Sequence, residues 1–162
     1  MLHEPEHISV TPSAKPADKI EQQLYFVEKQ EKRELLPDII RQSNVHQVLV
    51  FTRTKHGADR VARDLNRAGI KTKSIHGDKS QNQRQRALAD FKECKIAVLV
   101  ATDIAARGID INDLPLVINF DLPNIPETYV HRIGRTGRAG QEGTAISFCD
   151  RSELRTSRIS KS

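Results

Sequence analysis

The chain has 162 residues, with 26 lysines and arginines against 21 aspartates and glutamates, and a formal net charge of +5. This length suits a single domain with its own core. The basic surplus is compatible with nucleic acid or phosphate ligands but does not require them. No apolar run approaches the roughly 18 residues of a membrane helix, and no signal peptide opens the chain. We therefore expect a soluble, cytoplasmic protein without membrane association.

The segment 1–19 carries Pro5, Pro12 and Pro16 and little that could form a core. We interpret it as a linker or flexible arm, followed by one domain over residues 20–162. After Phe148 the sequence begins another helical pattern and then stops, so we expect the final helix to be truncated and the chain to be an excised piece of a longer protein.

Short β-rich stretches alternate with helical patterns from Ile20 onward. Several of the stretches are apolar throughout, as strands buried on both faces should be. The expected strands are 24–27, 48–51, 72–75, 96–101, 116–120 and 144–148. This alternation predicts an α/β fold with a mostly parallel sheet between two layers of helices.

Helices are expected at 31–41, 55–68 and 81–92, with a shorter one after Asn124. Gly69 is placed to end the second helix. Ser80 and Gln83 have the spacing of a capping box at the start of the third, and Asn124 with Glu127 repeats that spacing. Pro37 lies inside the first helical pattern and weakens it.

The two cysteines, Cys94 and Cys149, lack any metal-ligand spacing, and we expect both to be reduced and buried and no metal to be bound by this chain. Aromatic residues make up only 4% of the chain, and tryptophan is absent. This scarcity disfavours a base-stacking surface and favours contacts with phosphates and sugars, which are largely blind to sequence.

Parallel α/β sheets place ligands at the carboxyl ends of their strands. Polar, glycine-bearing segments follow three of the expected strands: TRTKHG, HGDKSQNQR and TDIAARGID. Each contains arginine or lysine, so together they predict one anion-binding surface. The alternative is that they are ordinary polar loops.

The segments ATDIAARGIDI (101–111) and YVHRIGRTGRAG (129–140) resemble motifs V and VI of the DEAD-box RNA helicases. VLVFTRT (48–54) resembles motif IV, and HGDKSQNQR (76–84) resembles the segment that carries the Q-x-x-R element of that family. The resemblance runs from about residue 20 to 148, and the motif sequences are most similar to those of the bacterial RhlE-like branch. It implies the second of the two RecA-like domains of such a helicase.

No P-loop sequence and no D-E-A-D quartet occur in the chain. The resemblance places those elements, and most contacts to ATP and Mg²⁺, in an N-terminal RecA-like domain of the same protein. It therefore implies an ATP-dependent RNA helicase as the full-length protein and an inactive, monomeric domain when this chain stands alone.

The arginine-rich segment 131–140 can supply positive charge to the γ-phosphate, as an arginine finger does during phosphoryl transfer. The spacing of Arg135 and Arg138 would let both point at one ligand from a helical turn. By resemblance, these two arginines are catalytic, His131 and Arg132 couple domain closure to hydrolysis, and Gly108 and Asp110 approach the ATP ribose. The alternatives are a solvated basic face for the arginines and a local loop cap for Asp110.

The remaining motif residues are expected, by the same resemblance, to contact the RNA backbone. They are Arg53, Thr54, Gly77, Asp78, Gln81, Arg84 and Thr102. Thr54 could instead be an ordinary helix N-cap, and Gln81 and Arg84 ordinary surface residues. Two other functions stay open at this point: a DNA helicase of the same superfamily and a stand-alone RNA-binding module without ATPase activity.

Overall fold

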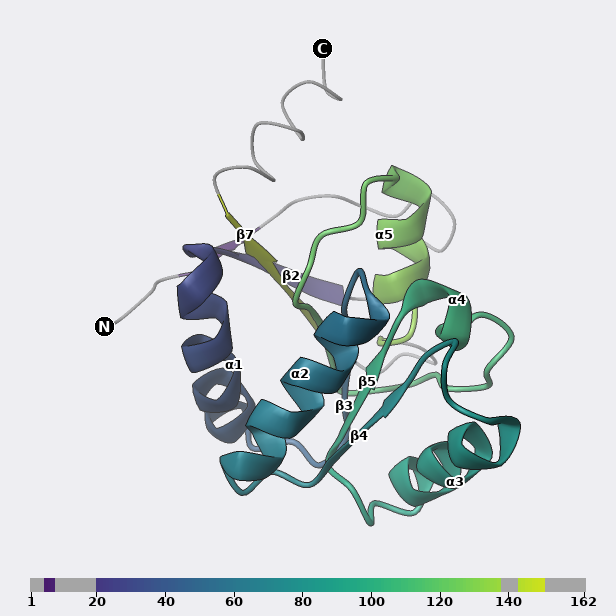
Figure 1. Cartoon of the computed structure of the whole chain (residues 1–162). Coiled ribbons are helices and arrows are strands. Elements are labelled where there is room, and N and C mark those ends of the chain that lie inside the picture. Colours follow the sequence, from purple (N-terminus) through teal and green to yellow (C-terminus); the bar gives the residue numbers. More distant parts are fainter. Residues whose placement is uncertain (1–4, 8–19, 138–142, 151–162) are drawn as a thin grey trace.

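Figure 1 shows the computed structural model, which describes residues 5–7, 20–137 and 143–150. Its strands are β1 (Glu6–His7), β2 (Ile20–Phe26), β3 (Val48–Phe51), β4 (Thr72–Ile75), β5 (Val98–Ala101), β6 (Leu116–Asn119) and β7 (Gly143–Cys149). Its helices are α1 (Lys29–Ser43), α2 (Lys55–Arg67), α3 (Gln81–Lys92), α4 (Asp103–Ala106) and α5 (Pro126–Ile133). Most of the expected linker, Arg138 and the expected final helix lie outside the described residues.

The strands form one sheet in the order β1-β2-β7-β6-β3-β5-β4. Every neighbouring pair is parallel except β1 with β2, which is antiparallel. The prediction of a mostly parallel α/β sheet is therefore confirmed. Strand β1 lies within the segment expected to be a linker, and there Glu6 pairs with Leu24 of β2.

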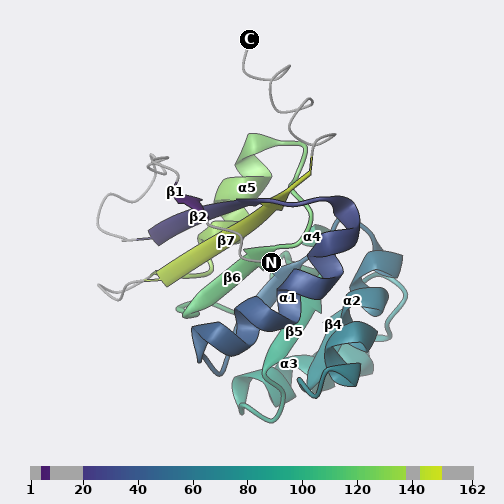
Figure 2. The ribbon, with the colours of Figure 1, turned by 90° about the vertical axis from the view of Figure 1, so that its left-hand side faces the viewer.

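Helices cover both faces of the sheet (Figures 1 and 2). Successive strand residues point to opposite faces, so Val48 and Val50 pack in the cluster that includes α1 and α2 residues. Leu49 and Phe51 pack in the opposite cluster, with residues of α3 and α4. Burial on both faces explains why the central strands are apolar throughout.

Helix α1 runs from Lys29 to Ser43 and continues through Pro37, whose missing N–H removes a helical hydrogen bond. The helix persists because Leu36, Ile39 and Ile40 are buried against the sheet. Tertiary packing therefore outweighs the local preference that weakened the sequence prediction.

The cap predictions had mixed outcomes. Ser80 and Gln83 form a reciprocal capping box, and Gly69 follows α2 with a φ of +87°, as expected. The cap expected at Asn124 is wrong, because α5 begins at Pro126 and Ile125 occupies the N-cap without a side-chain hydrogen bond. Proline suits the first helical position because its missing N–H would have no intrahelical partner there.

The cysteine prediction was correct for one residue only. Cys149 is buried in β7, whereas Cys94 is exposed just after α3, with a φ of +60°. Sequence composition favoured burial for both, but the turn that ends α3 carries Cys94 outward.

Candidate nucleotide and RNA interface

The loops that carry the motif residues meet at one edge of the sheet. Strands β3, β5 and β4 are consecutive neighbours and parallel, so the segments after them leave from the same end of the strands. We call this carboxyl-terminal side of the sheet, with segments 52–57, 76–84 and 102–110, the motif edge. The sequence prediction that these three segments form one surface is therefore consistent with the topology.

Two cations meet the turn after β4. The Nη2 group of Arg84, on α3, donates to the carbonyl oxygen of Gly77 at 3.4 Å. The Nζ group of Lys55, at the start of α2, lies 3.0 Å from the Asp78 carboxylate. Its hydrogen bond to Asp78 lowers the pKa of that carboxyl group. Lys55 was missed by sequence reasoning, although it directly follows Thr54 in the motif.

His76 stabilises the turn at Gly77 and Asp78 by a hydrogen bond from its buried side chain. Its side chain is buried, and its Nδ1 atom accepts a hydrogen bond from the backbone N–H of Asp78 at 3.2 Å. The Nε2 atom lies 2.9 Å from the carboxylate of Asp59, so the proton belongs on Nε2. Sequence reasoning missed this role, because no pattern around His76 marked its side chain as buried.

Asp59 receives several contacts beside His76. Its partial burial favours the neutral carboxyl group, but hydrogen bonds from Ser74 and His76 and the charge of Lys79 outweigh it. The pKa of Asp59 therefore lies below its ordinary value. This carboxylate ties α2 to β4 and to the turn that follows it.

The other residues expected to contact RNA have diverse surroundings. Thr54 is the N-cap of α2, and its hydroxyl accepts from the backbone N–H of Gly57 at 3.0 Å. The Arg53 guanidinium donates to the carbonyl oxygen of Leu122 at 2.8 Å, so it contacts the segment after β6. Thr102 occupies the N-cap of α4 without a side-chain capping bond, and Gln81 is exposed at the start of α3.

Arg132, expected to contact a partner domain, has its side chain buried inside this one. Its Nε and Nη2 atoms lie 2.6 and 2.7 Å from the two carboxylate oxygens of Asp103. Its Nη1 atom donates to Asn119 at 3.2 Å and to the carbonyl oxygen of Asp121 at 2.5 Å. The guanidinium also lies over the ring of Phe51, 5.1 Å from the centroid. The ion pair joins α5 to α4.

Arg135 lies just beyond the end of α5, in a turn where its N–H donates to the carbonyl oxygen of Arg132 at 3.3 Å. Its guanidinium donates to the carbonyl oxygens of Ala106 at 3.0 Å, Ile109 at 2.6 Å and Ile111 at 3.1 Å. The arginine thus holds the loop after α4, which contains Gly108 and Asp110. Two arginines of the 131–140 segment therefore clasp the 103–111 segment.

The structure brings Gly108 and Asp110 into that loop, where both are exposed. Gly108 has a φ of +79°, which favours glycine. Asp110 accepts a hydrogen bond from Asn112 at 2.9 Å. His131 is exposed on α5, so it and Arg132 point into different environments.

Residues 31–140 match the family described as Helicase conserved C-terminal domain. The chain belongs to this family. It is a helicase C-terminal domain of the DEAD-box type. It is 45% identical over 158 residues to the ATP-dependent RNA helicase CshA of Listeria monocytogenes, covering 98% of this chain and 30% of the relative. It is 50% identical over 131 residues to the mouse ATP-dependent RNA helicase DDX4, covering 81% of this chain and 19% of that protein.

Solved structures share the fold of this DEAD-box domain. The yeast splicing factor Prp28 aligns with a TM-score of 0.81 and 34% identity, over 95% of this chain and 34% of that one. A DEAD-box protein from Methanococcus jannaschii aligns with a TM-score of 0.77 and 43% identity, over 88% of this chain and 38% of that one. The RecA-like fold prediction is confirmed. The chain spans between 19% and 38% of these relatives' lengths, and the RhlE-like placement stays a prediction.

Within the described residues, no helix is both long and apolar enough to cross a bilayer. In the same part of the DEAD-box domain, no group of three or more His, Cys, Asp or Glu side chains could hold a metal ion. Two carboxylates at the motif edge are each paired with a cation, Asp78 with Lys55 and Asp103 with Arg132, an arrangement unsuited to Mg²⁺.

Proposed function

We propose that this domain is the half of an ATP-dependent RNA helicase that supplies arginines to ATP and one side of the RNA groove. The observation that carries the proposal is the clasp between the 131–140 and 103–111 segments. It fixes positive charge beside the exposed loop of Gly108 and Asp110, at an edge where a nucleotide held by another domain could dock.

The nucleotide side needs a second domain. The chain has no P-loop to hold phosphates, and the described residues offer no Mg²⁺ ligand cluster. An N-terminal RecA-like domain would bind ATP and Mg²⁺, while Arg135 and Arg138 would approach the phosphates across the cleft. Arg135 is held by three carbonyl groups and can act as a fixed charge. Arg138 would be the second arginine of the pair.

Coupling between the sites would pass through the clasp. Arg132 is buried on Asp103, next to Thr102 at the end of β5. A shift of α5 on domain closure would therefore move α4 and the Thr102 hydroxyl with it. The exposed His131 would make the direct contact with the partner domain.

On the RNA side, the turn at Gly77 and Asp78 would contact the sugar-phosphate backbone, flanked by Lys55 and Arg84. The side chain of Arg84 already reaches this turn, and its buried Nε has no hydrogen-bond partner among the described residues. The positive charge of its guanidinium beside this turn would favour a phosphate oxygen there. Arg53, Thr54, Gln81 and Thr102 would extend this contact along the same edge.

The test is an ATPase measurement on the complete protein with single-stranded RNA and, separately, with DNA of the same sequence. We expect hydrolysis that RNA stimulates and DNA does not, and no turnover by residues 1–162 alone. Equal stimulation by DNA would favour a DNA helicase. RNA binding without any ATPase activity in the complete protein would favour a stand-alone binding module.

A further inference from the structure

A basic groove lies outside the motif edge, across the free edge of the sheet. Strand β4 is the last strand of the sheet, with α2 and α3 on opposite faces beside it (Figure 1). The groove has a volume of about 730 Å³ and is lined by residues of all three elements and of the turn before α3. We call it the β4 groove.

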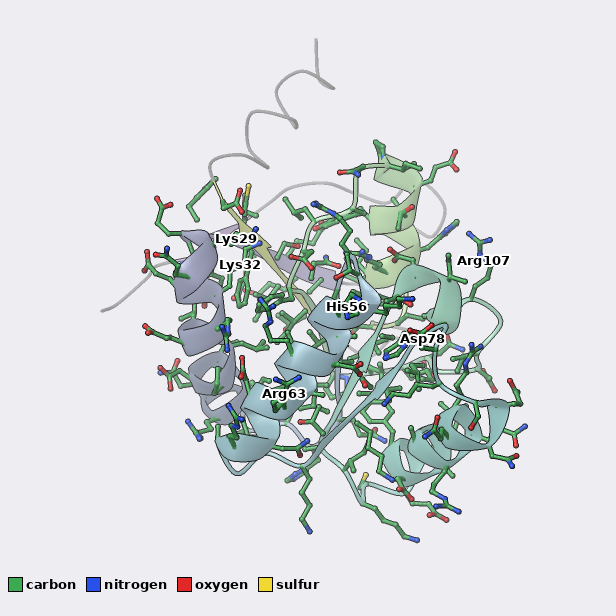
Figure 3. The ribbon with its side chains drawn as sticks, viewed as in Figure 1. Lys29, Lys32, His56, Arg63, Asp78 and Arg107 are labelled. Atoms are coloured by element: carbon green, nitrogen blue, oxygen red, sulfur yellow. The ribbon has the colours of Figure 1, made fainter. Side chains whose placement is uncertain are left out.

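The lining of the β4 groove is strongly cationic. Five of its side chains are basic and one, Asp59, is acidic; the basic ones are Arg63, Arg67, Lys73, Lys79 and Arg86. Lys73 pairs with Asp90 at 2.6 Å and Lys79 lies 3.7 Å from Asp59. The three arginines form no ion pair with any residue that the structure describes. Figure 3 labels Arg63 on α2.

The edge of β4 is poorly suited to adding a strand from a protein partner. Backbone groups along a strand point alternately to its two neighbours. The carbonyl oxygens of Lys71 and Ile75 accept hydrogen bonds from Val98 and Thr102 on the β5 side, so the backbone groups of residues 71, 73 and 75 point toward β5. Thr72 faces outward, but the Asn66 side chain accepts from its N–H at 2.9 Å and donates to its carbonyl at 3.0 Å. Only Ser74 remains to present outward backbone groups, so a peptide could not form a ladder here.

The lining instead matches a sugar-phosphate backbone. It contains no aromatic residue on which a base could stack. Its arginines carry planar forks of donors that suit phosphate oxygens. Electrostatic contact of this kind is independent of sequence.

The β4 groove is continuous with the RNA side of the motif edge. The N–H of Lys79, a groove residue, donates to the carbonyl oxygen of His76 at 3.1 Å, directly before the Gly77 turn. Gln83 caps Ser80 and also lines the groove, while Gln81 and Arg84 extend from the same first turn of α3. An RNA strand that continues past the turn at Gly77 and Asp78 would therefore reach the β4 groove next.

We infer that the β4 groove binds the phosphates of an RNA strand beyond the segment held at the motif edge. This inference rests on the proposed function, because the groove is read as an extension of its RNA site. It predicts that RNA length, more than RNA sequence, determines the affinity of the protein.

The test measures RNA binding by the complete protein, without nucleotide, by fluorescence anisotropy. The probes are oligouridines of about 6 and about 18 nucleotides, on the scale of one and several binding segments. The double variant Arg63→Gln plus Arg86→Gln removes one exposed cation from each wall of the groove. The matched control, Lys92→Gln plus Lys95→Gln, removes two exposed charges from the far end of α3 and the turn after it.

We expect the groove variant to bind the long probe roughly fivefold more weakly, because each removed arginine would lose one exposed ion pair with a phosphate. The slope of log affinity against log salt should fall by about 1.4 for that probe. The short probe and the lysine control should be unchanged. If the groove variant binds both probes as the wild type does, the inference is wrong. Arg67→Gln, in the last turn of α2, provides an independent single variant should the double variant melt early.

Two further measurements separate this inference from its rivals. Arg84→Ala should weaken both probes; if it weakens neither while the groove variant loses the long probe, the proposed motif-edge site fails and the groove stands. Polyglutamate is the competing probe for an acidic protein partner. If the groove variant loses polyglutamate binding but retains both RNA affinities, the β4 groove serves a protein and the inference is overturned.

Discussion

The substitution Arg132→Ala should destabilise the domain, whereas His131→Ala, one residue away, should not. Arg132 is only 2% exposed and bonds both oxygens of Asp103, as well as Asn119 and the Asp121 carbonyl. His131 is exposed on the same helix. The two residues share a motif, and the sequence alone gave them one role.

The magnitude follows from the surroundings of the ion pair. Removing one partner of a buried pair costs about 3–5 kcal/mol. The Asp103 side chain is 35% exposed and can be rehydrated, which reduces the loss. Asn119 is fully buried and would lose a donor. We therefore expect a loss of about 3 kcal/mol, or roughly 6–12 °C in Tm for a domain of this size.

Thermal unfolding monitored by circular dichroism on residues 1–162 measures the effect. Arg132→Lys should recover part of the loss, because it keeps the charge but not the two parallel hydrogen bonds. His131→Ala should change Tm by less than about 2 °C, as expected for a surface position. A Tm for Arg132→Ala within about 1 °C of wild type would refute the buried clasp.

Three further predictions concern the stability of the domain: a closely packed glycine in β7, the N-cap of α2 and the carboxylate of Asp59. Gly143→Ala should cost about 1–3 kcal/mol, because the new Cβ would lie 2.5 Å from the Gly137 nitrogen and closer still to the Thr136 hydroxyl; Gly77→Ala, with open space around it, should leave Tm unchanged. Thr54→Ala should cost about 1 kcal/mol through loss of the α2 N-cap, and Thr54→Ser should restore it; equal Tm values for both variants would contradict this role. The depressed pKa of Asp59 stabilises the fold above its unfolded value of about 3.9, and this stabilisation is lost as pH falls through the lower folded value. The Tm difference between wild type and Asp59→Asn should therefore be constant above about pH 5 and shrink below about pH 4; a difference independent of pH would show that Asp59 is not stabilised as a carboxylate.

The sequence predicted the parallel sheet well because its strands depend on local patterns, whereas the roles of the motif residues stay predictions. Strands β3 and β4 have the expected bounds, since their apolar or β-rich runs are short and sharply flanked. The persistence of α1 through Pro37 could not be predicted, because it depends on packing between distant segments. The same holds for Arg132 and Arg135: their motif identified them as functional, but their partners lie 11 to 29 residues away along the chain.

His76 and Lys55 illustrate the opposite failure. Both adjoin residues that the motifs singled out, yet neither carries a distinctive pattern of its own. Their roles arise from the side-by-side arrangement of β3, β5 and β4, which brings the start of α2 to the turn after β4. A sequence pattern gives the strand order only indirectly, so contacts across it become visible only in the structure.

The most direct test of separate ATP and RNA contacts is a paired measurement of kcat and RNA affinity in the complete protein. Arg138→Ala should lower kcat by about 10³-fold or more, as loss of an arginine finger does, while RNA binding without nucleotide persists. Arg84→Ala should weaken RNA binding and RNA stimulation, with little change in basal hydrolysis. If Arg138→Ala preserves kcat, or if both variants lose the same function to the same degree, the division of this edge into an ATP side and an RNA side is wrong.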